Sequence, residues 1–161
     1  MPAMLTMLAE RKVALAPGVP PFSFDPEMRG KVRTLFTQKE ALGPTQMIVL
    51  TARQAFIEKN RAALVDFMED NLRLVRWSAD PANRDEAIKI ASRLTRQPPD
   101  RFAGWLFTQS DYYRDPDMIP NIEVLQDNIG KQQEAGFLGQ PIDISNYVDL
   151  AVIKEAAARL R

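Results

Sequence analysis

The sequence contains no cysteine and no histidine, and these two absences remove most of the familiar catalytic chemistry. Without cysteine the chain has no disulfides, thiolate metal ligands or cysteine nucleophiles, although the absence leaves its compartment open. Without histidine it lacks the commonest general base and the commonest transition-metal ligand, which excludes triads and typical zinc sites. Only carboxylates, Lys, Tyr, Ser and Thr remain as candidates for catalysis, and we expect no metal and no cofactor.

The chain also lacks net charge and long apolar runs. Lys+Arg and Asp+Glu both number 21, so there is no excess charge to attract nucleic acid. Residues 1–10 have neither the basic start nor the cleavage site of a secretory signal, and no run approaches the roughly 20 apolar residues of a membrane span. At 161 residues we expect one domain, since a chain of this size buries roughly 70% of its unfolded surface.

The first third of the chain shows patterns of short strands. Residues 2–11 have apolar side chains at helical spacing, and residues 13–16 follow as a small buried strand. Residues 17–26 hold too many prolines for helix or central strand and predict an extended crossing segment anchored by two aromatics. Residues 31–36 alternate charged and apolar side chains, which suits a half-buried strand with Val32 inward.

The spacing of apolar residues changes most clearly from strand-like to helix-like in residues 43–56. Gly43 and Pro44 are a breaker pair, residues 47–50 are a short apolar run typical of a buried strand, and Thr51 with Gln54 fits a capping box. A long amphipathic helix over residues 52–77 then buries a stripe made of Phe56, Ala63, Leu64, Phe67, Met68, Leu72 and Val75.

The remaining sequence predicts helices. One starts at a possible cap formed by Asn83 and Glu86, and a short one starts at Asp100. A polar and aromatic loop follows at residues 111–117, and the next helix closes near Gly136. Residues 137–144 then form an extended link to a terminal helix. Ala87, Ile88, Ala91 and Leu94 form the inward stripe of the first of these helices. The short helix carries Phe102, Trp105 and Leu106, and the last two are marked by Ile119, Ile122, Leu125, Ile129, Val152, Ile153, Ala156 and Leu160. The expected fold is α/β, mostly helical, with a small sheet in the first third.

Several of these stretches match one known family. The segments that carry the likeness are residues 4–14, the crossing at residues 20–22, residues 47–56, and the tail at residues 136–138 and 147–149. They resemble the C-terminal half of periplasmic substrate-binding proteins of ABC transporters, of the nitrate, sulfonate and taurine type. The likeness covers nearly the whole chain, and its motifs are apolar and small residues rather than catalytic signatures.

This resemblance implies a two-lobed α/β protein that closes on a small anion at its hinge and delivers it to a membrane permease. It places residues 1–18 at the end of the second lobe, 19–22 in a hinge crossing and 23–161 in the returning first lobe. The full-length family is periplasmic and about twice as long. By analogy the chain is a truncated product or a C-terminal portion that lacks half of the ligand cleft.

The resemblance also places ligand contacts on two loops. Thr45 and Gln46 offer a hydroxyl and an amide to a polar head group, and Pro20 and Phe22 line the other loop. Two structural readings compete with this one: the turn at Gly43 is an ordinary turn, and Phe22 is a core anchor.

Other polar or aromatic clusters have structural explanations that we favour. Thr51 and Arg53 at a helix N-terminus are predicted to serve capping rather than anion binding. The cluster of Trp105, Tyr112, Tyr113 and Arg114 is read as packing beneath a loop rather than a cation cage. The carboxylates at Asp111, Asp115 and Asp117, and at Asp66, Glu69 and Asp70, are read as capping or solvated groups.

Two functional alternatives remain besides solute binding. The first is the pyrimidine-synthase branch of the same superfamily, whose chemistry depends on histidine and iron and which the absence of histidine disfavours. The second is a helical interaction module that binds no ligand.

Overall fold

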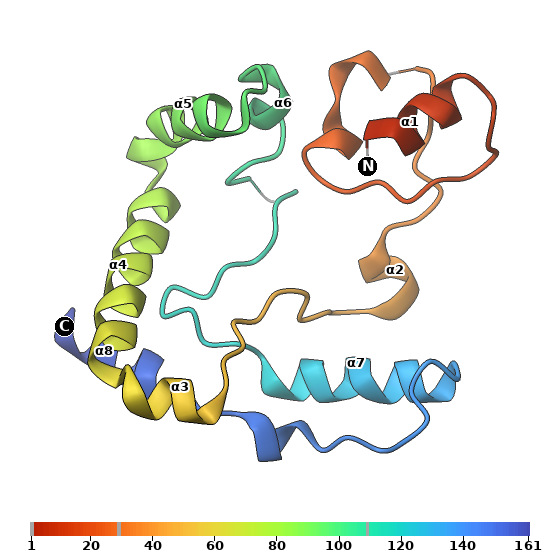
Figure 1. Ribbon diagram of the computed structural model, residues 1–161. Coiled ribbons are helices and arrows are strands. Elements are labelled where there is room, and N and C mark those ends of the chain that lie inside the picture. The colour runs from red at the N-terminus through yellow and green to blue at the C-terminus, as the bar shows by residue number, and fades with distance from the viewer. Residues whose placement is uncertain (1, 29, 109) are drawn as a thin grey trace. The chain divides into compact units, whose positions relative to one another are not determined.

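All regular structure in the described residues is helical (Figure 1). The computed structural model describes residues 2–28, 30–108 and 110–161, and no strand occurs among them. The α-helices are α1 (Pro2–Ala9), α2 (Gln38–Leu42), α3 (Gln54–Lys59), α4 (Arg61–Ala79), α5 (Arg84–Thr95), α6 (Asp100–Ala103), α7 (Ile122–Glu134) and α8 (Ala151–Arg159). Short 3-10 helices are η1 (Phe22–Phe24), η2 (Pro26–Met28), η3 (Pro81–Asn83) and η4 (Ile144–Tyr147). The predicted α/β fold is therefore wrong.

The three predicted strands fail for a common reason, which is that a strand is stabilised only by a hydrogen-bonded neighbour. Residues 13–16, 31–36 and 47–50 form no ladder with any described part of the chain, and their apolar side chains stay largely in solvent. Leu15, Phe36 and Ile48 are 64%, 62% and 73% exposed. The local pattern identified non-helical, apolar segments correctly but gave no information on whether a partner covers them.

The chain divides into two compact units. Unit 1 comprises Met1–Leu35 and Trp77–Tyr113, and unit 2 comprises Phe36–Arg76 and Arg114–Arg161. The division predicted from the resemblance, into residues 1–18, 19–22 and 23–161, stays a prediction.

The core of unit 1 is built around Trp105. Phe102, Leu106 and Ile88 of α5 are buried with it, and the ring of Phe24 stacks on the indole at a centroid distance of 5.5 Å. Phe24, one of the two aromatics predicted to anchor the proline-rich segment, makes this contact, but the segment is not extended, because residues 22–24 and 26–28 form 3-10 helices. Of the stripe predicted to point inward on α5, Ala87 and Ile88 are buried, whereas Leu94 is 74% exposed.

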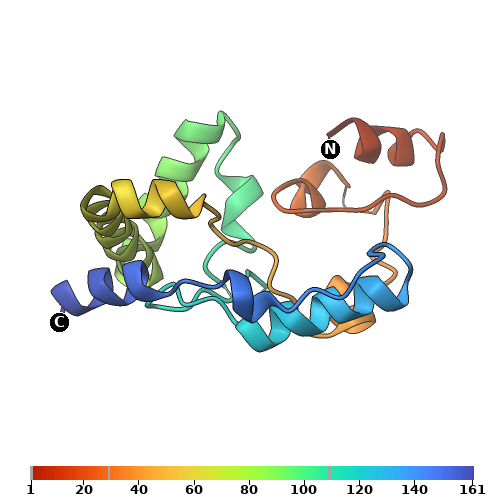
Figure 2. The same cartoon turned by 60° about the horizontal axis from the view of Figure 1, so that its bottom comes forward.

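The core of unit 2 is the contact between α4 and α8 (Figure 2). Val65 and Leu72, one heptad apart on α4, are fully buried against Ile153, Ala156 and Ala157 of α8. Two ion pairs join the same helices, Arg61 to Glu155 and Arg159 to Asp66, each at 2.8 Å.

The helix predicted over residues 52–77 is interrupted at Asn60, where α3 ends and α4 begins at an angle to it (Figures 1 and 2). The Asn60 side-chain amide donates to the carbonyl of Phe56 at 2.9 Å. The backbone of Asn60 has φ −120° and ψ 22°, outside the helical region, and asparagine is among the weaker helix formers.

The break also changes which face of the helix is buried. Phe56 and Phe67 were predicted to point inward, yet both are 52% exposed, while Val65, outside the predicted stripe, is fully buried. A stripe drawn through a single continuous helix therefore selected the wrong aromatic side chains.

Helix capping differs from the sequence prediction in three places. The predicted capping box of Thr51 and Gln54 is absent, because Arg53 is the N-cap of α3 and makes no side-chain cap bond. Asn83 stands at the N-cap of α5 but donates its side-chain amide to the carbonyl of Trp77. A capping box does form at α2, where Thr37 accepts from the amide of Glu40 and the Glu40 carboxylate accepts from the amide of Thr37.

Other predicted elements are confirmed. Residues 2–11 contain α1, the helix after residue 119 ends before Gly136, whose φ is +78°, and α8 forms the C-terminal helix. Gly136 takes the left-handed conformation that ends many helices and that glycine adopts without strain. In the described ranges no helix is both long and apolar enough to cross a membrane.

Candidate functional site

The loop of residues 43–46, where the sequence placed Thr45 and Gln46, is held against α7 by one side chain. The Asn128 amide oxygen accepts from the backbone N–H of Gln46 at 2.9 Å, and its nitrogen donates to the carbonyl of Pro44 at 3.2 Å. A single amide thus binds the backbone on both sides of Thr45. One turn further along α7, the Lys131 ammonium donates to the carbonyl of Leu42 at 2.7 Å. We call the contacts of Asn128 and Lys131 with residues 42–46 the α7 latch.

Gln46 contributes to this attachment with its own side chain. Its Oε1 accepts from the backbone N–H of Asn121 at 2.9 Å, and its Nε2 donates to the carbonyl of Ile48 at 2.8 Å. Both polar atoms of the amide therefore have protein partners. A ligand that used Gln46 would have to replace one of these bonds.

Thr45 is the predicted ligand residue that the latch leaves available. It is half-buried, and its hydroxyl makes no hydrogen bond within the described part of the chain. Because both neighbouring residues are fixed by Asn128, the hydroxyl is presented without further ordering of the backbone. The positive charge nearest in the latch, Lys131, is paired with Asp127 at 2.6 Å.

Pro20 and Phe22, the other predicted ligand residues, belong to unit 1, whereas Thr45 and Gln46 belong to unit 2. Pro20 is joined to Pro21 by a cis peptide bond, and Phe22 opens η1. Both side chains are half-buried. The ring contact made by this segment comes from Phe24, the second of its two aromatics, and not from the predicted ligand residue Phe22.

Two surface hollows are lined by other residues. One, of about 390 Å³, follows α1 and is lined by Leu8 and residues 11–14. The other, of about 370 Å³, lies on the α8 side of unit 2 and is lined by Asp117, Ile119, Lys154, Ala157, Ala158 and Arg161. None of the four predicted ligand residues lines either hollow.

Of the aromatic cluster predicted to be packing, Trp105 is packed in the core of unit 1. Trp105 is 5% exposed, donates its indole N–H to the carbonyl of Arg101 at 2.6 Å, and meets Tyr112 edge to face. A side chain this deeply covered cannot form the wall of an open cage. Tyr113, by contrast, is 86% exposed.

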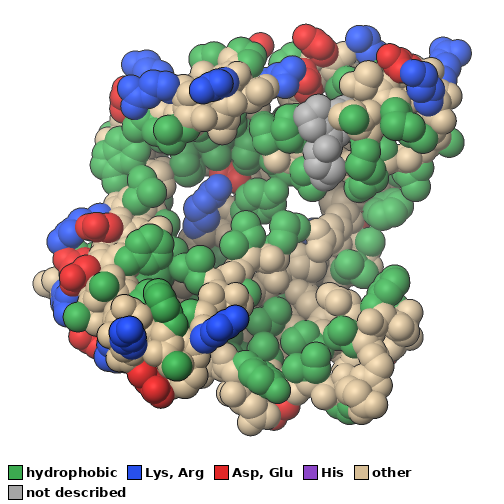
Figure 3. Space-filling view, viewed as in Figure 1, with side chains coloured by type: hydrophobic (Ala, Val, Ile, Leu, Met, Phe, Trp, Pro, Cys, Tyr) green, Lys and Arg blue, Asp and Glu red, His purple; other side chains and the backbone are tan. Residues whose placement is uncertain are grey.

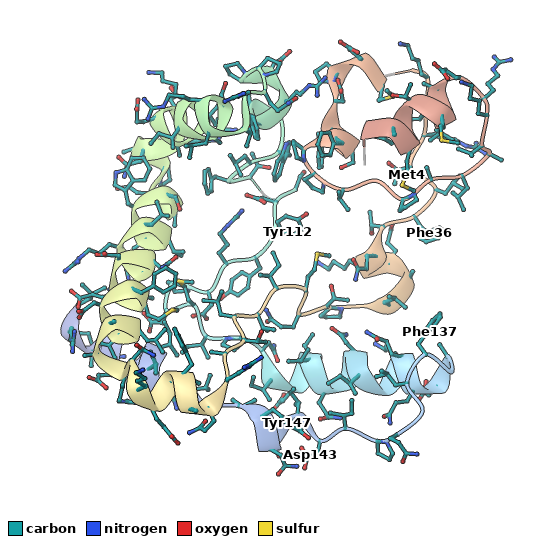
Figure 4. All side chains as sticks on the ribbon, in the orientation of Figure 1. Met4, Phe36, Tyr112, Phe137, Asp143 and Tyr147 are labelled. Atoms are coloured by element: carbon teal, nitrogen blue, oxygen red, sulfur yellow. The ribbon has the colours of Figure 1, made fainter. Side chains whose placement is uncertain are left out.

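The carboxylates are divided between local caps and ion pairs, since Asp66, Glu69, Asp70 and Asp117 each pair with an arginine. Asp115 accepts from the backbone N–H of Asp117 and of Ile119, which matches the capping role read from the sequence. Asp143, before η4, accepts from the Ser145 hydroxyl at 2.6 Å and from its backbone N–H, and these bonds lower the pKa of the Asp143 carboxyl (Figure 4). In the described ranges no three acidic side chains converge as a metal site would require.

Comparison with known proteins does not identify a family for this chain. Comparison of the chain with protein-family models, with curated proteins and with solved structures finds no match.

Proposed function

We propose that this chain serves as a solute-binding component of an ABC importer, taking a small anion such as a sulfonate or nitrate. The proposal rests on the resemblance of its apolar motifs to that family, and it is supported by one geometric observation. Asn128 fixes the backbone on both sides of Thr45 and leaves the threonine hydroxyl without a protein partner in the described residues. A hydroxyl held in this way is a suitable donor to an oxyanion.

In this role the chain carries out no chemistry on its ligand. Its residues bind and orient the anion, and a membrane permease receives it. By the same resemblance the protein would act in the periplasm. The complete cleft would include groups beyond the Thr45 loop, because one hydroxyl satisfies only a single lone pair of an oxyanion.

The test is a titration of the chain with taurine, methanesulfonate, nitrate and sulfate, followed by calorimetry and by tryptophan fluorescence. Replacing Thr45 with valine keeps the side-chain shape and removes the hydroxyl. We expect Thr45→Val to weaken binding about 10-fold or more, since a hydrogen bond to a charged group contributes roughly 1.5–3 kcal/mol. Thr51→Val is the matched control, because Thr51 is an exposed threonine in the same uncharged stretch.

A chain that is folded by circular dichroism and gives no saturable response to any of these anions would contradict solute binding. The second candidate, a helical interaction module without a small ligand, would then be favoured. Two observations favour this second candidate. Both polar atoms of the Gln46 side chain already form hydrogen bonds within the protein. The residues that follow, 47–50, are apolar and exposed.

A further inference from the structure

Two basic side chains at α8 pair with no other side chain of the described residues. Lys154 and Arg161 are exposed, and neither side chain makes an ion pair or a hydrogen bond within the described part of the chain. The other charged side chains of the helix, Glu155 and Arg159, are paired with side chains of α4. Figure 3 shows basic and acidic side chains next to each other over α4 and α8, at its lower left. The charges that these pairings leave over at α8 are therefore both positive.

The two cations line the same hollow, which is the one of about 370 Å³ on the α8 side of unit 2. Lys154, Ala157 and Ala158 are spaced by three and four residues, so they share one face of the helix. Arg161 follows the end of the helix and lines the hollow as well. An alanine side chain ends at Cβ, so the surface between the two long basic side chains is apolar and low.

The rest of the lining adds an apolar side chain and a carboxylate that already has a partner. Ile119 is half-buried. Asp117 accepts from the Arg76 guanidinium at 2.5 Å, and Arg76 also donates to the carbonyl of Pro116 at 3.3 Å. The carboxylate of Asp115, two positions earlier, accepts from two backbone N–H groups. Among the described residues the hollow thus combines an apolar lining with two unpaired cations and no unpaired carboxylate.

We infer that this hollow binds a small organic anion with one acidic head group and a short hydrocarbon body. The head group accepts hydrogen bonds from the Lys154 ammonium and the Arg161 guanidinium, neither of which has to leave a protein partner. The body covers Ile119 and the two alanines, and this burial favours an organic anion over an inorganic one.

The size of the hollow suits such a ligand. Its volume of about 370 Å³ lies within the range of roughly 300–1,000 Å³ that is usual for small-molecule sites, near the lower end. The hollow shares no residue with the Thr45 loop, so this binding is independent of the proposed solute-binding function. Few contacts are available, and we expect a dissociation constant on the order of 1 mM.

Hexanoate is the probe, acetate represents the head group alone, and hexanol represents the body alone. Amide NMR of the nitrogen-15-labelled chain should show saturable shifts at residues 117–119 and 157–158 with hexanoate. Acetate and hexanol should each bind about 5-fold more weakly or worse, because each lacks one of the two kinds of contact. Equal binding of hexanol and hexanoate would overturn the role of the cations, and equal binding of acetate would overturn the role of the apolar lining.

Charge substitutions test the two cations. Lys154→Gln and Arg161→Gln should each weaken hexanoate binding about 3-fold or more, as for the loss of one exposed charge contact. Lys59→Gln is the matched control, because Lys59 is an exposed lysine of α3 in the same unit and does not line the hollow. An equal loss in Lys59→Gln would reduce the effect to general attraction of anions and would overturn the site.

A larger side chain tests the hollow itself. Ala158→Leu fills it from an exposed helical position and should abolish hexanoate binding, whereas Ala63→Leu, the same change at an exposed alanine of α4, should leave binding intact. Leucine is a good helix former, so both variants should keep their helices. Unchanged binding in Ala158→Leu would place hexanoate elsewhere and overturn the site.

Thr45→Val separates this hollow from the proposed solute site. Hexanoate binding should be the same in Thr45→Val as in wild type. A loss in Thr45→Val with none in Lys154→Gln would assign hexanoate to the Thr45 loop and overturn the hollow. A chain that binds hexanoate at residues 157–158 but none of taurine, nitrate and sulfate would support the hollow and contradict only the proposed solute binding.

Discussion

The Arg101 guanidinium lies 2.7 Å from the Asp25 carboxylate, and this ion pair joins the turn between η1 and η2 to α6 inside unit 1. The Asp25 side chain is 10% exposed and that of Arg101 is 20% exposed. The other Asp25 oxygen accepts from the N–H of Glu27, and Arg101 also donates to Gln97. Both side chains of the ion pair therefore make a further hydrogen bond within the protein.

Removing one partner of this pair should be costly. Asp25→Ala leaves a poorly hydrated guanidinium, and we expect it to lower the free energy of unfolding of unit 1 by about 3 kcal/mol. Tryptophan fluorescence during urea unfolding reports on this unit, since Trp77 and Trp105 both belong to it. Glu10→Ala is the control, because the Glu10–Lys12 pair is exposed and should change stability by less than about 1 kcal/mol. Equal effects of the two substitutions would contradict a buried role for Asp25.

The two buried residues of α4 should dominate the stability of unit 2. Leu72→Ala deletes a fully buried side chain, and we expect a loss of about 2–5 kcal/mol. Phe67→Ala, on the same helix but half exposed, should cost less than about 1 kcal/mol. Far-UV circular dichroism during urea unfolding measures both. Similar losses for the two variants would show that α4 presents a different face to the core.

The capping box of α2 should make the start of this helix sensitive to acid. The hydrogen bonds from the Thr37 backbone N–H and from its hydroxyl hold the pKa of the Glu40 carboxyl below its ordinary value of 4.5. A lowered pKa means that the bonds contribute fully above the unfolded value and are lost as the pH falls through the folded one. Carbon-13 NMR of the Glu40 carboxyl should therefore show a midpoint below 4.5.

Two variants check the assignment of that midpoint. In Thr37→Ala the side-chain bond is absent, so the midpoint of Glu40 should move up towards the ordinary value. In Glu40→Gln the amide retains the capping geometry without a titrating group, and α2 should then show no change over the same pH range. Persistence of the acid transition in Glu40→Gln would assign it to another carboxyl.

The α7 latch should control the mobility of the Thr45 loop. Asn128→Ala removes the bonds to Pro44 and Gln46, and we expect faster hydrogen exchange at the Gln46 amide together with a loss of about 1–2 kcal/mol. Asn146→Ala is the control, since its side chain bonds only the nearby carbonyl of Asp143. An unchanged hydrogen-exchange rate at the Gln46 amide in Asn128→Ala would show that the other contacts, from Asn121 and Lys131, are enough to hold the loop.

The sequence predicted the helices better than it predicted their surroundings. Capping and periodicity are local, so α1, α7, α8 and the buried residues Phe102, Trp105 and Leu106, in and just after α6, were found from residues close together in the chain. The strand at residues 47–50 was predicted from apolar character alone, and its environment depends on a partner that no local pattern encodes. The capping box at Thr37 and Glu40 has the required spacing and was detectable, but the neighbouring alternation in residues 31–36 drew the interpretation towards a strand.

The candidate site shows the same division. Thr45 and Gln46 were identified as polar residues on a loop, which their composition allows. Their attachment to Asn128, 82 positions away from Gln46, was not foreseen, because an asparagine in the middle of a helix carries no sign of its long-range partner. For the same reason, the sequence did not show that both polar atoms of the Gln46 side chain are bound within the protein.

The separation of α4 from α8 along the chain affects how the protein emerges from the ribosome. Arg61 and Glu155, which join the two helices, are 94 positions apart. At 5–20 residues per second, synthesis of that interval takes roughly 5 to 19 s, during which Val65 and Leu72 have no α8 to cover them. Nascent chains would therefore expose these side chains for seconds before unit 2 can close, which gives a chaperone time to bind and makes late truncations prone to aggregate.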